Sequence, residues 1–202
     1  MRQLVFVIMV LALAINVAAQ EEETLFKGNF EKGGFGGPVV KFISIKGQSA
    51  AMIGGRGGWI INHSLALGGG GYGVASEVDA PAGVLPLEGP LDIEFGYVGF
   101  ELEYIIHPKS LAHFSIYTLI GGGATNYVND VGPVTESNEQ VGETDFLFVW
   151  EPAVNAELNV TTWFRLNAGV SYRLVTGVKQ EGLENRDFRG MAATLTFKFG
   201  KF

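Results

Sequence analysis

The feature that most constrains this chain is a series of strand-length segments in which apolar and polar residues alternate. In the clearest one, 164–174, the even positions from Phe164 to Leu174 are apolar, whereas Arg165 and Arg173 lie on the odd positions. Because side chains of a β-strand point alternately to opposite sides, this segment has one oily face and one charged face. In a soluble barrel, the bulky apolar side chains would have to pack inside a small interior. The opposite arrangement, with the oily face outside, is typical of a membrane β-barrel.

Turn signals between the alternating runs divide the chain into eight strands. The predicted strands are 35–45, 49–61, 65–77, 91–106, 111–124, 144–158, 162–176 and 189–201. The connections 62–64, 107–110 and 159–161 are short, whereas three of the four at the other end, 79–89, 125–143 and 179–188, are long and polar. Short turns at one end and longer loops at the other characterise outer-membrane barrels. The sequence therefore predicts an all-β fold, an eight-stranded antiparallel up-and-down transmembrane β-barrel.

The N-terminal residues have the layout of a secretory signal. Arg2 precedes an apolar stretch from Leu4 to Ile15, which is shorter than the roughly 20 residues that a membrane-spanning helix needs. The chain has no cysteine, so neither disulfides nor a lipidated cysteine are expected. The predicted organisation is a signal peptide at 1–19, a periplasmic leader at 20–34 and the outer-membrane barrel at 35–202.

Charged residues indicate which face of each strand points inward. A Lys or Arg that faces lipid at the bilayer midplane costs roughly 2 to 4 kcal/mol, whereas one that faces the lumen does not. The outward residues are then Val98, Phe100, Leu102 and Tyr104 on 91–106, and Phe146, Phe148 and Trp150 on 144–158. The strand 35–45 is ambiguous because Lys41 has apolar neighbours on both faces. The predicted polar network of the lumen is Arg56, Glu101, Glu103, His113, Glu151, Glu157, Arg165, Arg173 and Lys198.

The composition of this network predicts a closed lumen. Four carboxylates share the space with four permanent cations, and the interior of an eight-stranded barrel is just wide enough for its own side chains. We therefore expect ion pairs and hydrogen bonds to fill the barrel, with no open pore for solutes.

The strand count, the loop asymmetry and the closing run from Leu195 to Phe202 resemble the small eight-stranded outer-membrane β-barrel proteins, the class of the OmpA-type transmembrane domain. The resemblance covers 35–202. It implies residence in the bacterial outer membrane among its lipids and assembly by the barrel-assembly machinery, with Phe202 as the targeting residue. Phe197 and Phe199 lie on the opposite parity from Phe202, which predicts a bulge or turn near Gly200. A monomer is expected.

A hydrolase is the first alternative. His113 and Ser115 share one face, and Glu101 or Glu103 lies on the neighbouring predicted strand, so a Ser/His/Glu site that acts on lipid is conceivable from residue types alone. His113 follows a periplasmic turn, however, whereas the lipid substrate would lie in the outer leaflet. The preferred interpretation is a lumen histidine paired with a glutamate.

Two further patterns suggest other binding functions. Gly57-Gly58-Trp59 matches the G-x-W of lipocalins, which are secreted small-ligand carriers, but it falls on the second strand and not the first. Gly68 to Gly73 matches the dinucleotide-binding G-x-G-x-x-G, but no helix follows it. A lipocalin-like carrier remains the second alternative.

The remaining polar residues point to an exposed surface. The formal net charge of −7 disfavours a nucleic-acid partner, and the three histidines are too scattered to predict a metal site. No catalytic residue and no cofactor are predicted. The expected function is that of a non-enzymatic integral outer-membrane protein, either structural or acting through its acidic loops on a partner that the sequence does not identify.

Overall fold

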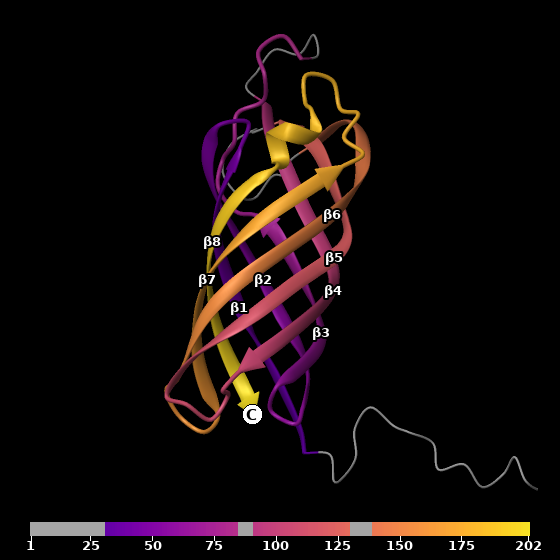
Figure 1. Ribbon diagram of the computed structural model, residues 1–202. Coiled ribbons are helices and arrows are strands. Elements are labelled where there is room, and N and C mark those ends of the chain that lie inside the picture. The colour runs from indigo at the N-terminus through magenta and orange to yellow at the C-terminus, as the bar shows by residue number, and fades with distance from the viewer. Residues whose placement is uncertain (1–30, 85–90, 130–138) are drawn as a thin grey trace, which may run out of the picture. The chain divides into compact units, whose positions relative to one another are not determined.

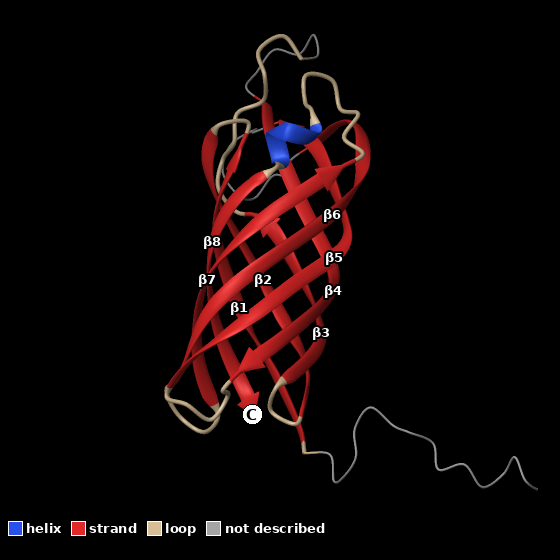
Figure 2. Cartoon of the chain, in the orientation of Figure 1, coloured by secondary structure: helices blue, strands red, loops and turns tan. Residues whose placement is uncertain are grey.

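The computed structural model describes residues 31–84, 91–129 and 139–202, and the predicted signal peptide and most of the predicted leader lie outside these ranges. Eight antiparallel strands pair in chain order, and β8 pairs with β1, so that the sheet closes into a barrel (Figures 1 and 2). The strands are β1 Lys32–Ile45, β2 Gln48–Ile61, β3 Leu65–Val74, β4 Leu91–Ile106, β5 Ala112–Asn129, β6 Glu139–Asn159, β7 Phe164–Thr176 and β8 Gly190–Lys201. The predicted fold class is confirmed.

The two ends of the barrel differ. At one end, which we call the turn end, the connections 62–64, 107–111 and 160–163 are short and the C-terminus lies beside them (Figure 1). At the other, the loop end, the connection after β7 contains a 3-10 helix, η1, at Asn185–Phe188. Among the described residues no helix is long and apolar enough to cross a membrane.

Two strands are longer at the loop end than predicted. β5 continues to Asn129 and β6 already begins at Glu139, so the boundaries predicted for the 125–143 loop are wrong. The pairing shifts register between Thr125 and Tyr127, and Tyr127 is fully buried with its hydroxyl donating to the carbonyl oxygen of Glu181 at 2.5 Å. The β5 extension pairs with the start of β4, where Thr125 and Asn126 both hydrogen-bond to Glu94, although it carries no alternating apolar signal.

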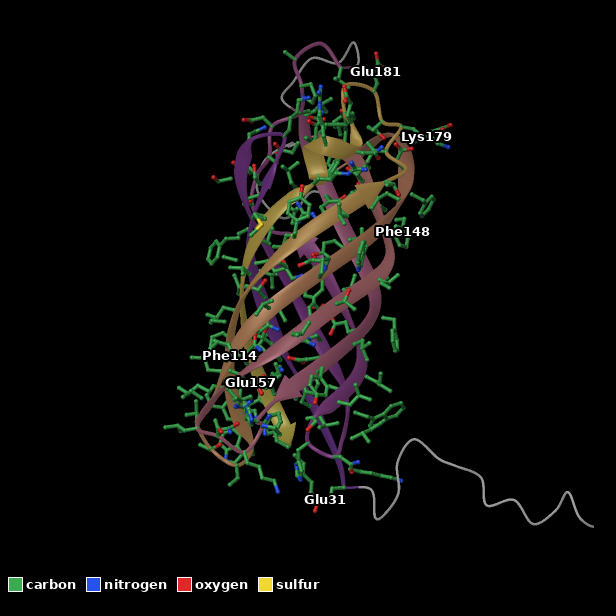
Figure 3. All side chains as sticks on the ribbon, viewed as in Figure 1. Glu31, Phe114, Phe148, Glu157, Lys179 and Glu181 are labelled. Carbon is green, nitrogen blue, oxygen red and sulfur yellow. The ribbon has the colours of Figure 1, made fainter. Side chains whose placement is uncertain are left out.

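Apolar side chains cover the outside of the barrel. Val98, Phe100 and Phe146 are 66%, 59% and 80% exposed, and Figure 3 shows Phe114 and Phe148 projecting from the barrel wall. The predicted outward faces of β4 and β6 are therefore correct. Large exposed apolar side chains lie on every strand except β3, and such an area of apolar surface marks contact with a membrane or a partner.

The interior changes in character along the barrel axis. A large apolar cluster occupies the loop end, where Phe188 from η1 packs beside Phe95 with ring centroids 4.9 Å apart. A small apolar group of Phe35, Ile60 and Ala66 lies near the turn end, with Phe202 packed against it. Polar and charged side chains fill the space between these two regions.

The C-terminal strand departs from one prediction. The pairing of β8 with β1 and with β7 keeps the same register through the predicted irregular region, so no bulge occurs near Gly200. Phe202 continues the inward parity of Lys198. Its ring is half-buried and lies 4.0 Å below the guanidinium of Arg165. The expectation of a bulge is wrong because this last aromatic ring contacts the interior of the barrel.

Candidate functional site

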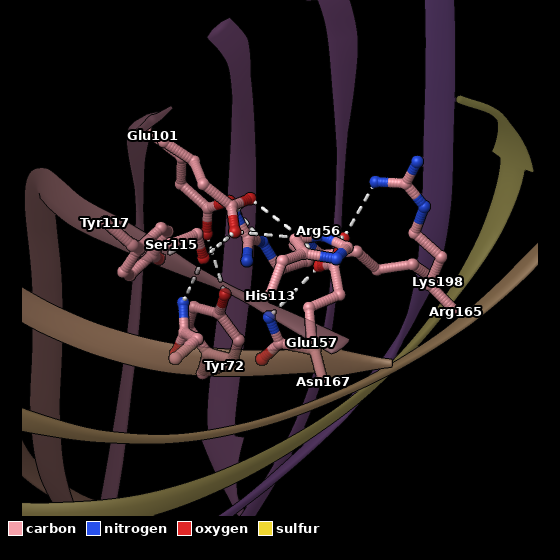
Figure 4. Close-up of polar contacts among 12 residues, drawn as sticks. Arg56, Tyr72, Glu101, His113, Ser115, Tyr117, Glu157, Arg165, Asn167 and Lys198 are labelled. Atoms are coloured by element: carbon pink, nitrogen blue, oxygen red, sulfur yellow. Dashed lines mark hydrogen bonds and ion pairs between the residues drawn. The ribbon is translucent and has the colours of Figure 1, made fainter. Parts of the chain in front are cut away.

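The structure places all nine predicted network residues inside the barrel. Each is between 1% and 8% exposed, and together they come from β2, β4, β5, β6, β7 and β8. Inward parity alone brings them there, because alternate residues of a closed sheet share the lumen. Figure 4 shows that most of them meet in one group of hydrogen bonds and ion pairs.

Lys198 of β8 joins two carboxylates. Its Nζ lies 2.9 Å from both carboxylate oxygens of Glu103 on β4 and 2.5 Å from Oε2 of Glu157 on β6. Arg165 donates to Glu157 at 2.9 Å, and His113 lies 3.1 Å from the same carboxylate. One buried ammonium therefore connects three strands across the lumen, which favours a single register of the sheet.

Glu101 forms a second centre. It accepts hydrogen bonds from Nε of Arg56 and from the hydroxyls of Tyr72 and Tyr117, each at 2.7 Å. Arg56 also donates to Glu103 at 3.0 Å, so it links this centre to the first. The guanidinium lies 4.4 Å from the ring centroid of Tyr117, which adds a cation–π contact.

A third centre pairs the predicted Glu151 with Lys41, whose direction the sequence left ambiguous. Lys41 is 2% exposed, and its Nζ lies 2.8 Å from Glu151 and 3.0 Å from the hydroxyl of Tyr97. The ammonium also lies 3.7 Å from the centroid of the Tyr72 ring. Tyr97 could have been found, since it shares the parity of Glu101 on the same strand. Lys41 could not, because both faces of β1 are apolar.

Arg173 is held differently from the other cations. It donates to the carbonyl oxygen of Phe188 at 2.7 Å and to that of Ser44 at 3.3 Å, and its guanidinium lies 5.1 Å from the ring of Phe95. These contacts connect β7 to η1 and to β1. Arg173 therefore anchors the segment that closes the loop end.

The interior holds almost no free volume between these centres. The cavity lined by Lys41, Arg56, Tyr117 and Glu151 measures about 10 Å³, roughly the volume that a single water needs. This cavity offers no space for a small organic ligand. Among the described residues, the polar interior is thus packed by its own side chains.

The residues of the hydrolase alternative do not form a catalytic arrangement. The Oγ of Ser115 donates to Glu103 at 2.6 Å, while the ring nitrogens of His113 lie next to Glu157 and the carbonyl oxygen of Ser110. No hydrogen bond joins His113 to Ser115 in the described part of the chain. Ser115 is also fully buried, so no acyl carbonyl can reach it without opening the barrel.

The barrel resembles solved structures of outer-membrane proteins. The N-terminal β-barrel domain of Pseudomonas aeruginosa OprF matches with a TM-score of 0.52 at 11% identity, covering 84% of this chain and 96% of that one. Neisserial surface protein A matches with a TM-score of 0.51 at 15% identity, covering 87% of this chain and all of that one. No protein-family model and no curated protein sequence matches. The likeness is one of fold, that of the small eight-stranded outer-membrane barrels.

Proposed function

We propose that this chain is a non-enzymatic integral protein of the bacterial outer membrane that contributes to the envelope and presents its loop end for contacts outside the cell. The observation that carries the proposal is that large aromatic and aliphatic side chains are exposed on the outside of the barrel, while ion-paired charged residues are buried inside it. Such a surface is stable only against hydrocarbon or an equally apolar partner. A closed barrel leaves no free strand edge, which favours a monomer.

The loop end supports the contact role because part of it is preordered. Lys46 donates to the carbonyl oxygen of Gly182 at 2.9 Å, and the side chain of Gln48 exchanges two hydrogen bonds with the backbone of Asp79. The backbone N–H of Val178 donates to Asn185 at 3.0 Å. A surface that is ordered before binding loses less conformational entropy when a partner docks.

Cell fractionation and surface proteolysis test the placement. We expect the chain in the outer-membrane fraction, with gel mobility that changes on heating because the barrel unfolds. Trypsin added to intact cells should cut after Lys179, an exposed residue of the loop end, but not after Lys109, an exposed residue of the turn end. After lysis both sites become accessible.

A matched variant and one contrary result complete the test. Lys179→Gln should abolish the cut after residue 179 in intact cells, while a cut after the exposed Arg186 remains and the barrel still folds. Recovery of the chain as a soluble protein without detergent would overturn the proposal and would favour a carrier. Cleavage after Lys109 alone in intact cells would reverse the proposed orientation.

A further inference from the structure

A groove on the outer surface crosses β4, β5 and β6. Its volume is about 550 Å³, within the range of roughly 300 to 1,000 Å³ that is usual for sites of small molecules. Gly96, Gly122 and Ala124 line it together with the exposed side chains of Val98 and Phe146. These positions share the outward parity of their strands, so the groove faces away from the lumen.

The groove offers a ligand no polar side chain. Tyr72 and Tyr97 also contribute to its lining, but both are buried and their hydroxyls donate inward to Glu101 and Glu151. The backbone beneath is paired in the sheet, with Val98 opposite Gly122 and Ala124 opposite Phe146. A polar ligand would lose its hydrogen bonds to water here without replacing them, whereas a hydrocarbon has none to lose.

Packing within the protein does not require a glycine at the outward-pointing position 122. A Cβ added to the inward-pointing Gly99 would lie 2.8 Å from the carbonyl oxygen of Ile120, so bulk is excluded there. A Cβ at Gly122 would meet only the carbonyl oxygen of Leu147, at 3.7 Å, an ordinary contact distance. A larger side chain would fit this strand and raise its β-propensity. Because residue 122 is a glycine instead, the outer surface has a depression that the packing of the barrel does not require.

We propose that this groove holds one acyl chain of a membrane lipid, a proposal that rests on the proposed membrane placement. The groove is continuous with the apolar belt, since Phe100, Ile120 and Phe148 follow along the same strands and are 49% to 59% exposed. On all three strands it lies nearer the loop end, so the lipid belongs to the outer leaflet. An unfilled groove would lose dispersion contacts, and a hydrocarbon chain lying along the exposed backbone restores them.

Native mass spectrometry of the full chain released from detergent micelles tests this with dipalmitoyl phosphatidylethanolamine as the probe. The wild-type barrel should retain one lipid. Gly122→Leu and Ala124→Leu fill the groove from two strands, and each should lower the lipid-bound fraction roughly fivefold or more. The matched control is Gly55→Leu, because Gly55 is exposed on β2 and its Cβ would lie 3.5 Å from the nearest atom, outside the groove.

The outcomes separate this proposal from the membrane placement. Heat-modifiable gel mobility of each variant reports folding, and solubility without detergent reports the membrane placement; neither should change. Equal lipid retention in all three variants would overturn the acyl-chain site while leaving the placement intact. Loss of a dimer, instead of a lipid adduct, in the two groove variants would assign the groove to a second copy of the chain and would also overturn it.

Discussion

The ammonium of Lys198 lies 2.9 Å from both carboxylate oxygens of Glu103, although β8 and β4 lie on opposite sides of the barrel. The pair is almost completely buried, at 1% exposure for each side chain. A contact across the lumen of this kind depends on the closure and the register of all eight strands. It therefore reports on the integrity of the whole barrel.

Replacing Lys198 should be strongly destabilising. Lys198→Met leaves Glu103 and Glu157 buried without their shared cation, and the loss of one partner from a buried pair costs roughly 3 to 5 kcal/mol. Urea unfolding in lipid vesicles measures the change in the free energy of unfolding. The double variant Lys198→Met with Glu103→Met should recover part of the loss, and additive effects would show that the two residues are not coupled.

A charge introduced into the exposed apolar belt should show whether the belt faces a membrane or water. Phe100 is 59% exposed near the middle of β4, so Phe100→Lys should cost about 2 to 4 kcal/mol of unfolding free energy in a bilayer. Glu94→Lys, on the same face near the loop end, should cost no more than about 1 kcal/mol. If Phe100→Lys leaves the stability unchanged and raises solubility without detergent, the belt faces water.

Arg173 should control the order of the segment after β7. Without its hydrogen bond to the carbonyl oxygen of Phe188, η1 loses a connection to the barrel wall. Arg173→Met should increase hydrogen exchange at 177–189 by roughly fivefold or more, as expected from the loss of about one hydrogen bond, while exchange in the middle of β4 stays slow. Lys109→Met at the turn end serves as the control and should leave this segment protected.

His113 should act in stability and not in catalysis. His113→Ala removes a partner of Glu157, so the free energy of unfolding should fall by about 1 to 3 kcal/mol. Lipid mass spectra from cells that carry the variant should match those of the wild type. A change in lipid acylation in His113→Ala and also in Ser115→Ala would revive the hydrolase alternative.

The sequence alone was sufficient for the parts of the fold that follow from local periodicity. Alternation with period two predicted all eight strands. The free-energy cost of a charge in lipid predicted that four carboxylates point inward, those of Glu101, Glu103, Glu151 and Glu157. Both arguments need only one strand at a time, so no knowledge of neighbouring strands is required. The extension of β5 and β6 was missed because pairing with neighbouring strands, and not an alternating apolar face, stabilises it.

Only the tertiary structure decided which inward groups meet. Three features depend on the register between strands and on how the sheet closes. They are the inward direction of Lys41, the link of Lys198 to Glu103 and Glu157, and the position of Phe202 under Arg165. A period of two specifies a face but not a height along the barrel or a partner across it. Pairing in the lumen is therefore a property of the closed barrel, which joins residues far apart in the chain.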